Sequence, residues 1–198
     1  MSRSACLSIL GAVLIGAPLA AGPMPQASKP QPTKPPANAN AVVMADFQKR
    51  VDAYVALHRK LEETLPKLSK QTNPHEIDAH ERALGTLVQT ARKAAKPGDI
   101  LTPAMQRVVR TLLRPIFSGS EGAQIKNEIL DKEYKGNAKL VVNARYPDEV
   151  PISTVPPQVL ASLPKLPEEL EYRFIQNSLI LFDSHAHIIV DFMDRAFL

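Results

Sequence analysis

The spacing of hydrophobic residues changes once along this chain, near Gly136, and this change constrains the fold more than any other feature. Before Gly136, apolar residues recur every three or four positions, which is typical of one buried face of a helix. After it, runs rich in β-branched and aromatic residues follow at 172–175, 179–183 and 188–192. The short gaps between these runs favour antiparallel pairing. Helices followed by strands predict an α+β fold, with an N-terminal bundle of three to four helices packed on a small C-terminal antiparallel sheet.

Start and stop residues divide the helical half into four predicted helices. Asn73 and Thr102 each precede a proline, and an N-cap residue followed by proline at the first helical position marks a helix start. Pro115 is expected to bend or end the third helix, because proline lacks the N–H that a helix interior uses. The predicted helices cover about 47–65, 74–96, 103–116 and 121–133, and the β-formers of residues 140–146 predict a further strand.

The last predicted strand shows which of its side chains are expected to be buried against the helices. Ile188, Val190 and Phe192 alternate with Ile189 and Asp191, so the first three are predicted to face the helical half. The register of the preceding strand decides which of its side chains join them. The alternatives are Leu179 with Leu181, or Ile180 with Phe182.

The N-terminus is typical of an exported protein. Arg3 precedes an apolar stretch at 5–15 and a group of small residues ending at Ala21, which predicts a signal peptide over residues 1–21. A Pro-rich segment follows, and we expect residues 22–42 to be a disordered linker. Residues 43–198 are then a single α+β domain, helical over 43–134 and β-rich over 138–198. No transmembrane segment is expected after signal cleavage.

One cluster of residues near the C-terminus could bind a metal. Asp183, His185 and His187 resemble the D-x-H-x-H motif that opens amidohydrolase-type barrel enzymes, in which two histidines on a strand end face one metal. Too few residues follow His187 to form such a barrel. A polar hairpin turn is therefore the preferred interpretation, and no metal or other cofactor is expected. Further ligands for a metal would have to come from Asp191, Asp194, His58, His75 or His80.

Arginine residues on the third predicted helix are the candidate contact for an anionic partner. Arg107, Arg110 and Arg114 are three and four positions apart and therefore form one stripe. This stripe could meet an anionic component of the cell envelope or pair with the more acidic C-terminal half. A G-x-x-G sequence at 119–122 resembles the loop of a KH nucleic-acid module, but Glu121 within it repels phosphate. We therefore predict no nucleic-acid partner.

Five short sequences between Gly98 and the C-terminus stand out, at 98–103, 143–147, 156–160, 166–174 and 188–192. Together they resemble a group of exported bacterial proteins of unknown function. The resemblance implies a shared fold and export, and it brings no catalytic residue or cofactor. We find no recognisable nucleophile elbow or phosphate-binding loop in the sequence. We therefore predict an exported non-enzymatic module that acts by binding or contact in the cell envelope. The alternative is a metal-dependent hydrolase that uses Asp183, His185 and His187.

Overall fold

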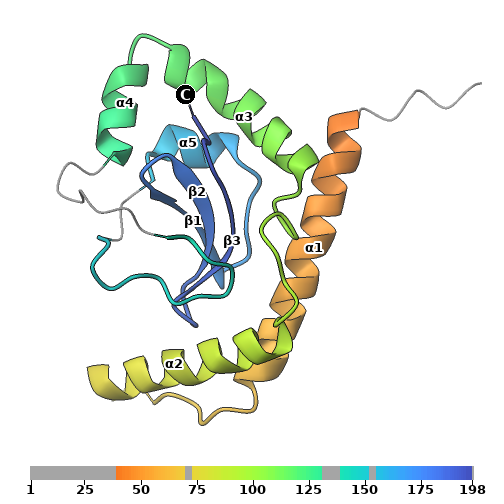
Figure 1. The fold of residues 1–198 in the computed structure, drawn as a ribbon, viewed down its shortest axis with the longest axis vertical. Coiled ribbons are helices and arrows are strands. Elements are labelled where there is room, and N and C mark those ends of the chain that lie inside the picture. Colours follow the sequence, from red (N-terminus) through yellow and green to blue (C-terminus); the bar gives the residue numbers. More distant parts are fainter. Residues whose placement is uncertain (1–38, 70–72, 131–138, 152–154, 198) are drawn as a thin grey trace, which may run out of the picture. The chain divides into compact units, whose positions relative to one another are not determined.

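Helices come first and strands last along the part of the chain that the computed structural model describes, residues 39–69, 73–130, 139–151 and 155–197. The predicted α+β fold is confirmed (Figure 1). The three strands form one antiparallel sheet in the order β1-β2-β3. The described elements are α1 Ala39–Glu62, α2 Pro74–Ala91, α3 Pro103–Ser118, α4 Gly122–Ile129, α5 Pro157–Ser162, β1 Leu170–Ile175, β2 Ser178–Asp183 and β3 Ile188–Met193.

The beginning of the chain lies outside the described residues. This applies to the predicted signal peptide, residues 1–21, and to residues 22–38 of the predicted linker. Helix α1 begins at Ala39, within the range that the sequence assigned to the linker. Among the helices that the structure describes, none has a stretch both long and apolar enough to cross a membrane.

The predicted helix starts are formed by the residues that the sequence indicated. The Asn73 side chain accepts the N–H of Glu76, and the Glu76 side chain accepts the N–H of Asn73, which makes a capping box at the start of α2. The Thr102 side chain caps α3 by accepting the N–H of Met105. Pro115 does not end α3, which continues to Ser118. This proline lies on the exposed side of the helix, where water can satisfy the carbonyl group that it leaves free.

The sheet is buried on both faces, because every residue of β2 and β3 is buried. Leu179 and Leu181 pack in the same cluster as helix residues, which resolves the alternatives that the sequence left open. Ile180 and Phe182 pack on the opposite face. Ile188 and Val190 face the helices as predicted, but the prediction for Phe192 is wrong: this side chain packs with Ile180 on the other face.

A β-bulge explains the position of Phe192. Leu181 pairs with Asp191, whereas its neighbour Phe182 pairs with Ile189, so Val190 is an extra residue in β3. One extra residue inverts the alternation beyond it, because side chains along a strand point to opposite faces in turn. The bulge therefore brings Phe192 to the face that the regular pattern assigned to Asp191.

Residues 139–151 cover the second face of the sheet without forming the predicted strand. They make a single bridge, between Arg145 and Ile188, and the N–H of Tyr146 donates to the carbonyl of His187 at 2.9 Å. Asn143 has a φ of 62°, in the left-handed region, which interrupts an extended path. Tyr146 and Val150 from this segment fill the cluster around Phe182.

Candidate metal centre

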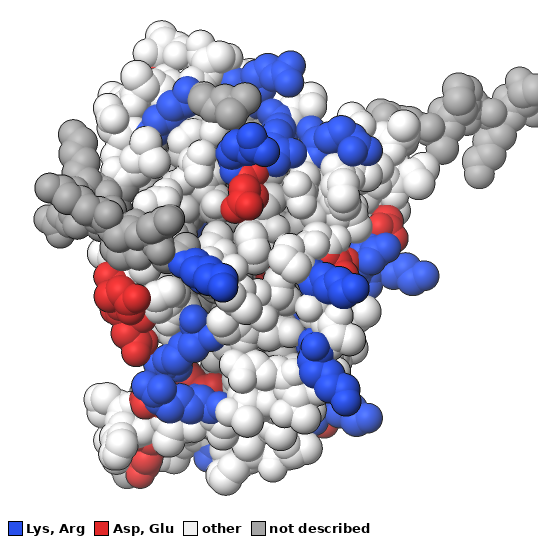
Figure 2. Space-filling model, in the orientation of Figure 1, with Lys and Arg blue, Asp and Glu red and all other residues white. Residues whose placement is uncertain are grey.

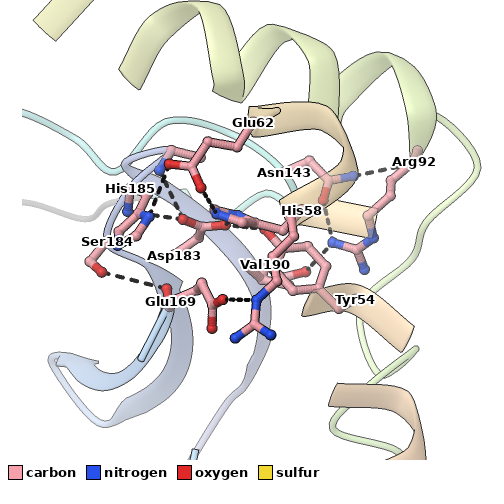
Figure 3. Close-up of polar contacts among 12 residues, drawn as sticks. Tyr54, His58, Glu62, Arg92, Asn143, Glu169, Asp183, Ser184, His185 and Val190 are labelled. Atoms are coloured by element: carbon pink, nitrogen blue, oxygen red, sulfur yellow. Dashed lines mark hydrogen bonds and ion pairs between the residues drawn. The ribbon is translucent and has the colours of Figure 1, made fainter. Parts of the chain in front are cut away.

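A buried carboxylate joins the first helix to the sheet. Asp183 is the last residue of β2, and its Oδ2 atom accepts a hydrogen bond from the Tyr54 hydroxyl at 2.5 Å. The same oxygen lies 2.7 Å from Nδ1 of His58, one turn further along α1. His58 and Asp183 are fully buried, and Tyr54 is nearly so. Figure 3 shows the three side chains converging between α1 and the strand.

The second oxygen of Asp183 holds the turn between β2 and β3. Oδ1 accepts the backbone N–H groups of His185 at 3.0 Å and Ala186 at 2.8 Å. Burial disfavours the charged forms of Asp183 and His58. Their mutual hydrogen bond and opposite charges outweigh this effect, so the pKa of Asp183 is lowered and that of His58 is raised. One aspartate thus fixes the orientation of the His58 ring and the position of His185.

The other ring nitrogen of His58 points to a second carboxylate. Nε2 is buried, has no hydrogen-bond partner among the residues that the structure describes, and lies 3.4 Å from Oε2 of Glu62. The other oxygen of Glu62 lies 3.1 Å from Nδ1 of His185 and 3.8 Å from Nε2 of His80 on α2. Figure 3 shows Glu62 lying against both His58 and His185. The Glu62 carboxylate is therefore surrounded by imidazole nitrogens from α1, α2 and the β2–β3 turn.

This arrangement has the geometry of a metal centre. The ligand atoms of His58, Glu62 and His185 all lie within 4.8 Å of one another, a spread that one cation with bonds of about 2.0–2.2 Å can bridge after small side-chain movements. The carboxylate of Asp183 is hydrogen-bonded to the other ring nitrogen of His58, and metal-binding histidines commonly have such a carboxylate partner. The side chain of His185 is 43% exposed, so an ion can reach the group from solvent.

The structure does not bring the three sequence candidates together. Asp183 and His185 lie close, but the oxygens of Asp183 are occupied by buried donors. His187 has a φ of 51° and lies elsewhere, with Nδ1 3.7 Å from Glu81 and its ring edge-on to Phe182. Burial and a nearby arginine lower the pKa of His187. His187 therefore does not belong to the candidate metal centre, and Asp183 contributes to it by hydrogen bonding to His58.

Sequence reasoning missed Glu62, although a signal was present. His58 and Glu62 are four positions apart on a predicted helix, and this spacing places two ligands on the same face. His58 and His80 were possible additional ligands in the sequence, and both lie beside Glu62 in the structure. His75 is exposed, and its side chain does not belong to the group.

The arginine stripe of α3 is only partly used within the chain. Arg110 donates to the backbone carbonyls of Asp194 at 2.8 Å and Arg195 at 3.0 Å. Arg107 and Arg114 are exposed. Figure 2 shows Lys and Arg side chains gathered at the end of the molecule where α3, α4 and the C-terminal residues lie.

Comparison with known proteins adds no candidate function. No family model matches this sequence, and neither a search of curated proteins nor a search of solved structures found a match. The chemistry of the site must therefore be inferred from its geometry.

Proposed function

We propose that the protein is an exported module that acts by binding and that it holds one zinc ion through His58, Glu62 and His185. The observation that carries the proposal is the Nε2 atom of His58. In the neutral ring, Asp183 fixes the proton on Nδ1, so Nε2 presents a buried lone pair to the carboxylate of Glu62. A lone pair facing a carboxylate is unfavourable, and either a metal ion between the two groups or a proton on Nε2 removes the repulsion.

The ligand types favour zinc over calcium or magnesium. Imidazole nitrogen suits zinc and similar transition metals, whereas calcium and magnesium prefer sites made entirely of oxygen. His80 lies close enough to Glu62 to supply the fourth ligand of a closed tetrahedral site after a side-chain rotation. If water takes that position instead, the site has the open coordination of a catalytic zinc. This possibility keeps a metal-dependent hydrolase as the second candidate, with His58, Glu62 and His185 in place of the motif found in the sequence.

Metal analysis tests the proposal directly. Protein purified without a histidine tag is expected to contain about one zinc per chain, and removal by a chelator should lower the melting temperature. Zinc binds the folded site and not the unfolded chain, so adding it back should restore the temperature. A protein that holds no zinc, and whose melting temperature does not respond to zinc, would show instead that a protonated His58 links Asp183 and Glu62.

Matched histidine variants identify the ligands. His185→Ala is expected to weaken zinc binding by at least about tenfold, while changing the stability of the zinc-free protein by less than about 1 kcal/mol, because His185 is exposed. His187→Ala and His75→Ala should keep the zinc. Loss of zinc in His187→Ala would contradict the ligand set and favour the motif found in the sequence.

His80 separates the binding module from the hydrolase. If His80 completes the site, His80→Ala should weaken zinc binding, and the zinc-loaded parent should not hydrolyse ester, phosphoester or amide substrates. Zinc-dependent hydrolysis by the parent, lost in Glu62→Gln and kept in His80→Ala, would establish the second candidate.

The export part of the proposal is supported by the sequence of residues 1–21 alone. We expect the mature protein to begin after about Ala21, and mass spectrometry of protein from the native cells measures this. A mature chain that still begins at Met1 would refute export by a cleaved signal peptide and would leave the zinc proposal unaffected.

A further inference from the structure

A pocket with a basic wall is lined by residues that do not belong to the candidate metal centre. It has a volume of about 230 Å³ and is formed by α3, α4 and the last described residues. Four cationic side chains line it, and its described lining includes no acidic side chain. Figure 2 shows the concentration of Lys and Arg side chains on this part of the surface. The cations are Arg110, Arg114, Lys126 and Arg195.

The positive charge of this pocket is not neutralised by the arginine contacts that the structure describes. Arg110 is held by two backbone carbonyl groups, which orient its guanidinium without cancelling its charge. Among the described residues, neither Arg110, Arg114 nor Arg195 forms an ion pair with an acidic side chain. Arginine side chains that no carboxylate of the described residues pairs with attract anions, and guanidinium groups match the geometry of phosphate oxygens.

Packing holds the pocket in shape. The ring of Phe197 lies against Phe117 of α3 at 4.5 Å and against Phe174 of β1 at 5.7 Å between ring centroids. The N–H of Ala196 donates to the carbonyl of Asn177 at 2.8 Å. Phe117 and Phe197 also line the pocket, so apolar surface lies beside the cationic groups. A site fixed before binding loses little conformational entropy when a ligand arrives.

We propose that this pocket binds the phosphate of an anionic phospholipid headgroup and so places the protein on a membrane surface. The arginine side chains contact the phosphate oxygens. The rings of Phe117 and Phe197 form the apolar part of the pocket beside these arginines. Neither the zinc site nor its ligands take part, so this interaction is independent of the function proposed above.

Flotation with lipid vesicles tests the inference. The protein, purified as the cell processes it, is mixed with vesicles of equal parts phosphatidylcholine and phosphatidylglycerol, or of phosphatidylcholine alone. We expect binding to the first vesicles only. Arg114→Glu should weaken this binding by more than about tenfold. Each basic side chain near an anionic membrane contributes favourable binding free energy, and a charge reversal both removes that contribution and adds a repulsion of similar size. Lys49→Glu on α1 makes the same change of net charge outside the pocket and should have a much smaller effect.

A second variant avoids any damage to the fold. Arg195 has a φ of 50°, a region that glycine adopts freely, so Arg195→Gly removes the cation without straining the backbone. It should melt at or above the temperature of the parent and still bind vesicles less well. Equal losses in Arg114→Glu and Lys49→Glu would show unspecific attraction and overturn the proposal. Binding of soluble glycerol 3-phosphate in calorimetry, dependent on Arg114 but without vesicle binding, would assign the pocket to a free phosphate ligand and also overturn it.

Discussion

Replacing Asp191 by alanine is expected to lower the free energy of unfolding by about 3–5 kcal/mol. The Asp191 carboxylate is fully buried and accepts three backbone N–H groups from the connection between α2 and α3. Gly98 donates at 2.8 Å, Ile100 at 2.7 Å and Leu101 at 2.8 Å. Alanine would leave these donors without a partner, and Ile100 and Leu101 are too deeply buried to reach water. A domain of this size is stable by only about 5–15 kcal/mol, so the variant should accumulate poorly.

Asp99 in the same connection provides the matched control. Its carboxylate also accepts a backbone N–H, from Lys96 at 2.9 Å, but the residue is exposed. Asp99→Ala should therefore cost less than about 1 kcal/mol, because water replaces the lost acceptor. Urea unfolding followed by circular dichroism measures both variants. If Asp191→Ala costs no more than Asp99→Ala, Asp191 does not hold this connection.

Removal of the second buried aspartate should affect both stability and metal binding. Asp183→Ala is expected to cost about 3–5 kcal/mol, because it leaves His58 and the Tyr54 hydroxyl buried without an acceptor. Asp183→Asn keeps an oxygen in place and should cost less. Since the amide no longer holds the His58 ring as a carboxylate does, zinc affinity of Asp183→Asn should fall by about 10–100-fold.

Two measurements are needed to separate these effects. Unfolding of the zinc-free variants gives the structural cost, and zinc titration of folded Asp183→Asn gives the loss of affinity. Asp148, whose side chain is 68% exposed, is the control: Asp148→Ala should change the free energy of unfolding by less than about 1 kcal/mol and leave zinc binding unchanged. An Asp183→Asn protein with the zinc affinity of the parent would show that Asp183 has only a structural role.

The sequence indicates some ligands of the candidate metal centre and not others. A recognisable motif indicates His185, and the sequence also offers His58 and His80 as additional ligands. The motif also included His187, which the left-handed backbone at that residue turns toward Glu81. Glu62 lies over a hundred residues from His185, and only the packing of α1 on the hairpin brings them together. No spacing rule within one segment can predict that contact.

Elements with local causes could be predicted from the sequence. The capping box of Asn73 and Glu76 and the cap of Thr102 begin two helices where predicted, and three hydrophobic runs with short turns between them form the antiparallel sheet. These features depend on residues within one turn or one hairpin, so their energies can be assessed from neighbouring residues.

Which side chains each face of the sheet buries, and which polar groups meet, depends instead on contacts between distant segments. The extra residue Val190 inverts the end of β3 and moves Phe192 to the second face, where residues 139–151 replace the expected strand. Asp191 was predicted to point away from the helices, yet its carboxylate accepts backbone N–H groups of the connection between α2 and α3, among them that of Gly98. Both results depend on contacts between segments far apart in the chain. Burial makes an unpaired donor costly, and it therefore selects these contacts over the regular strand pattern.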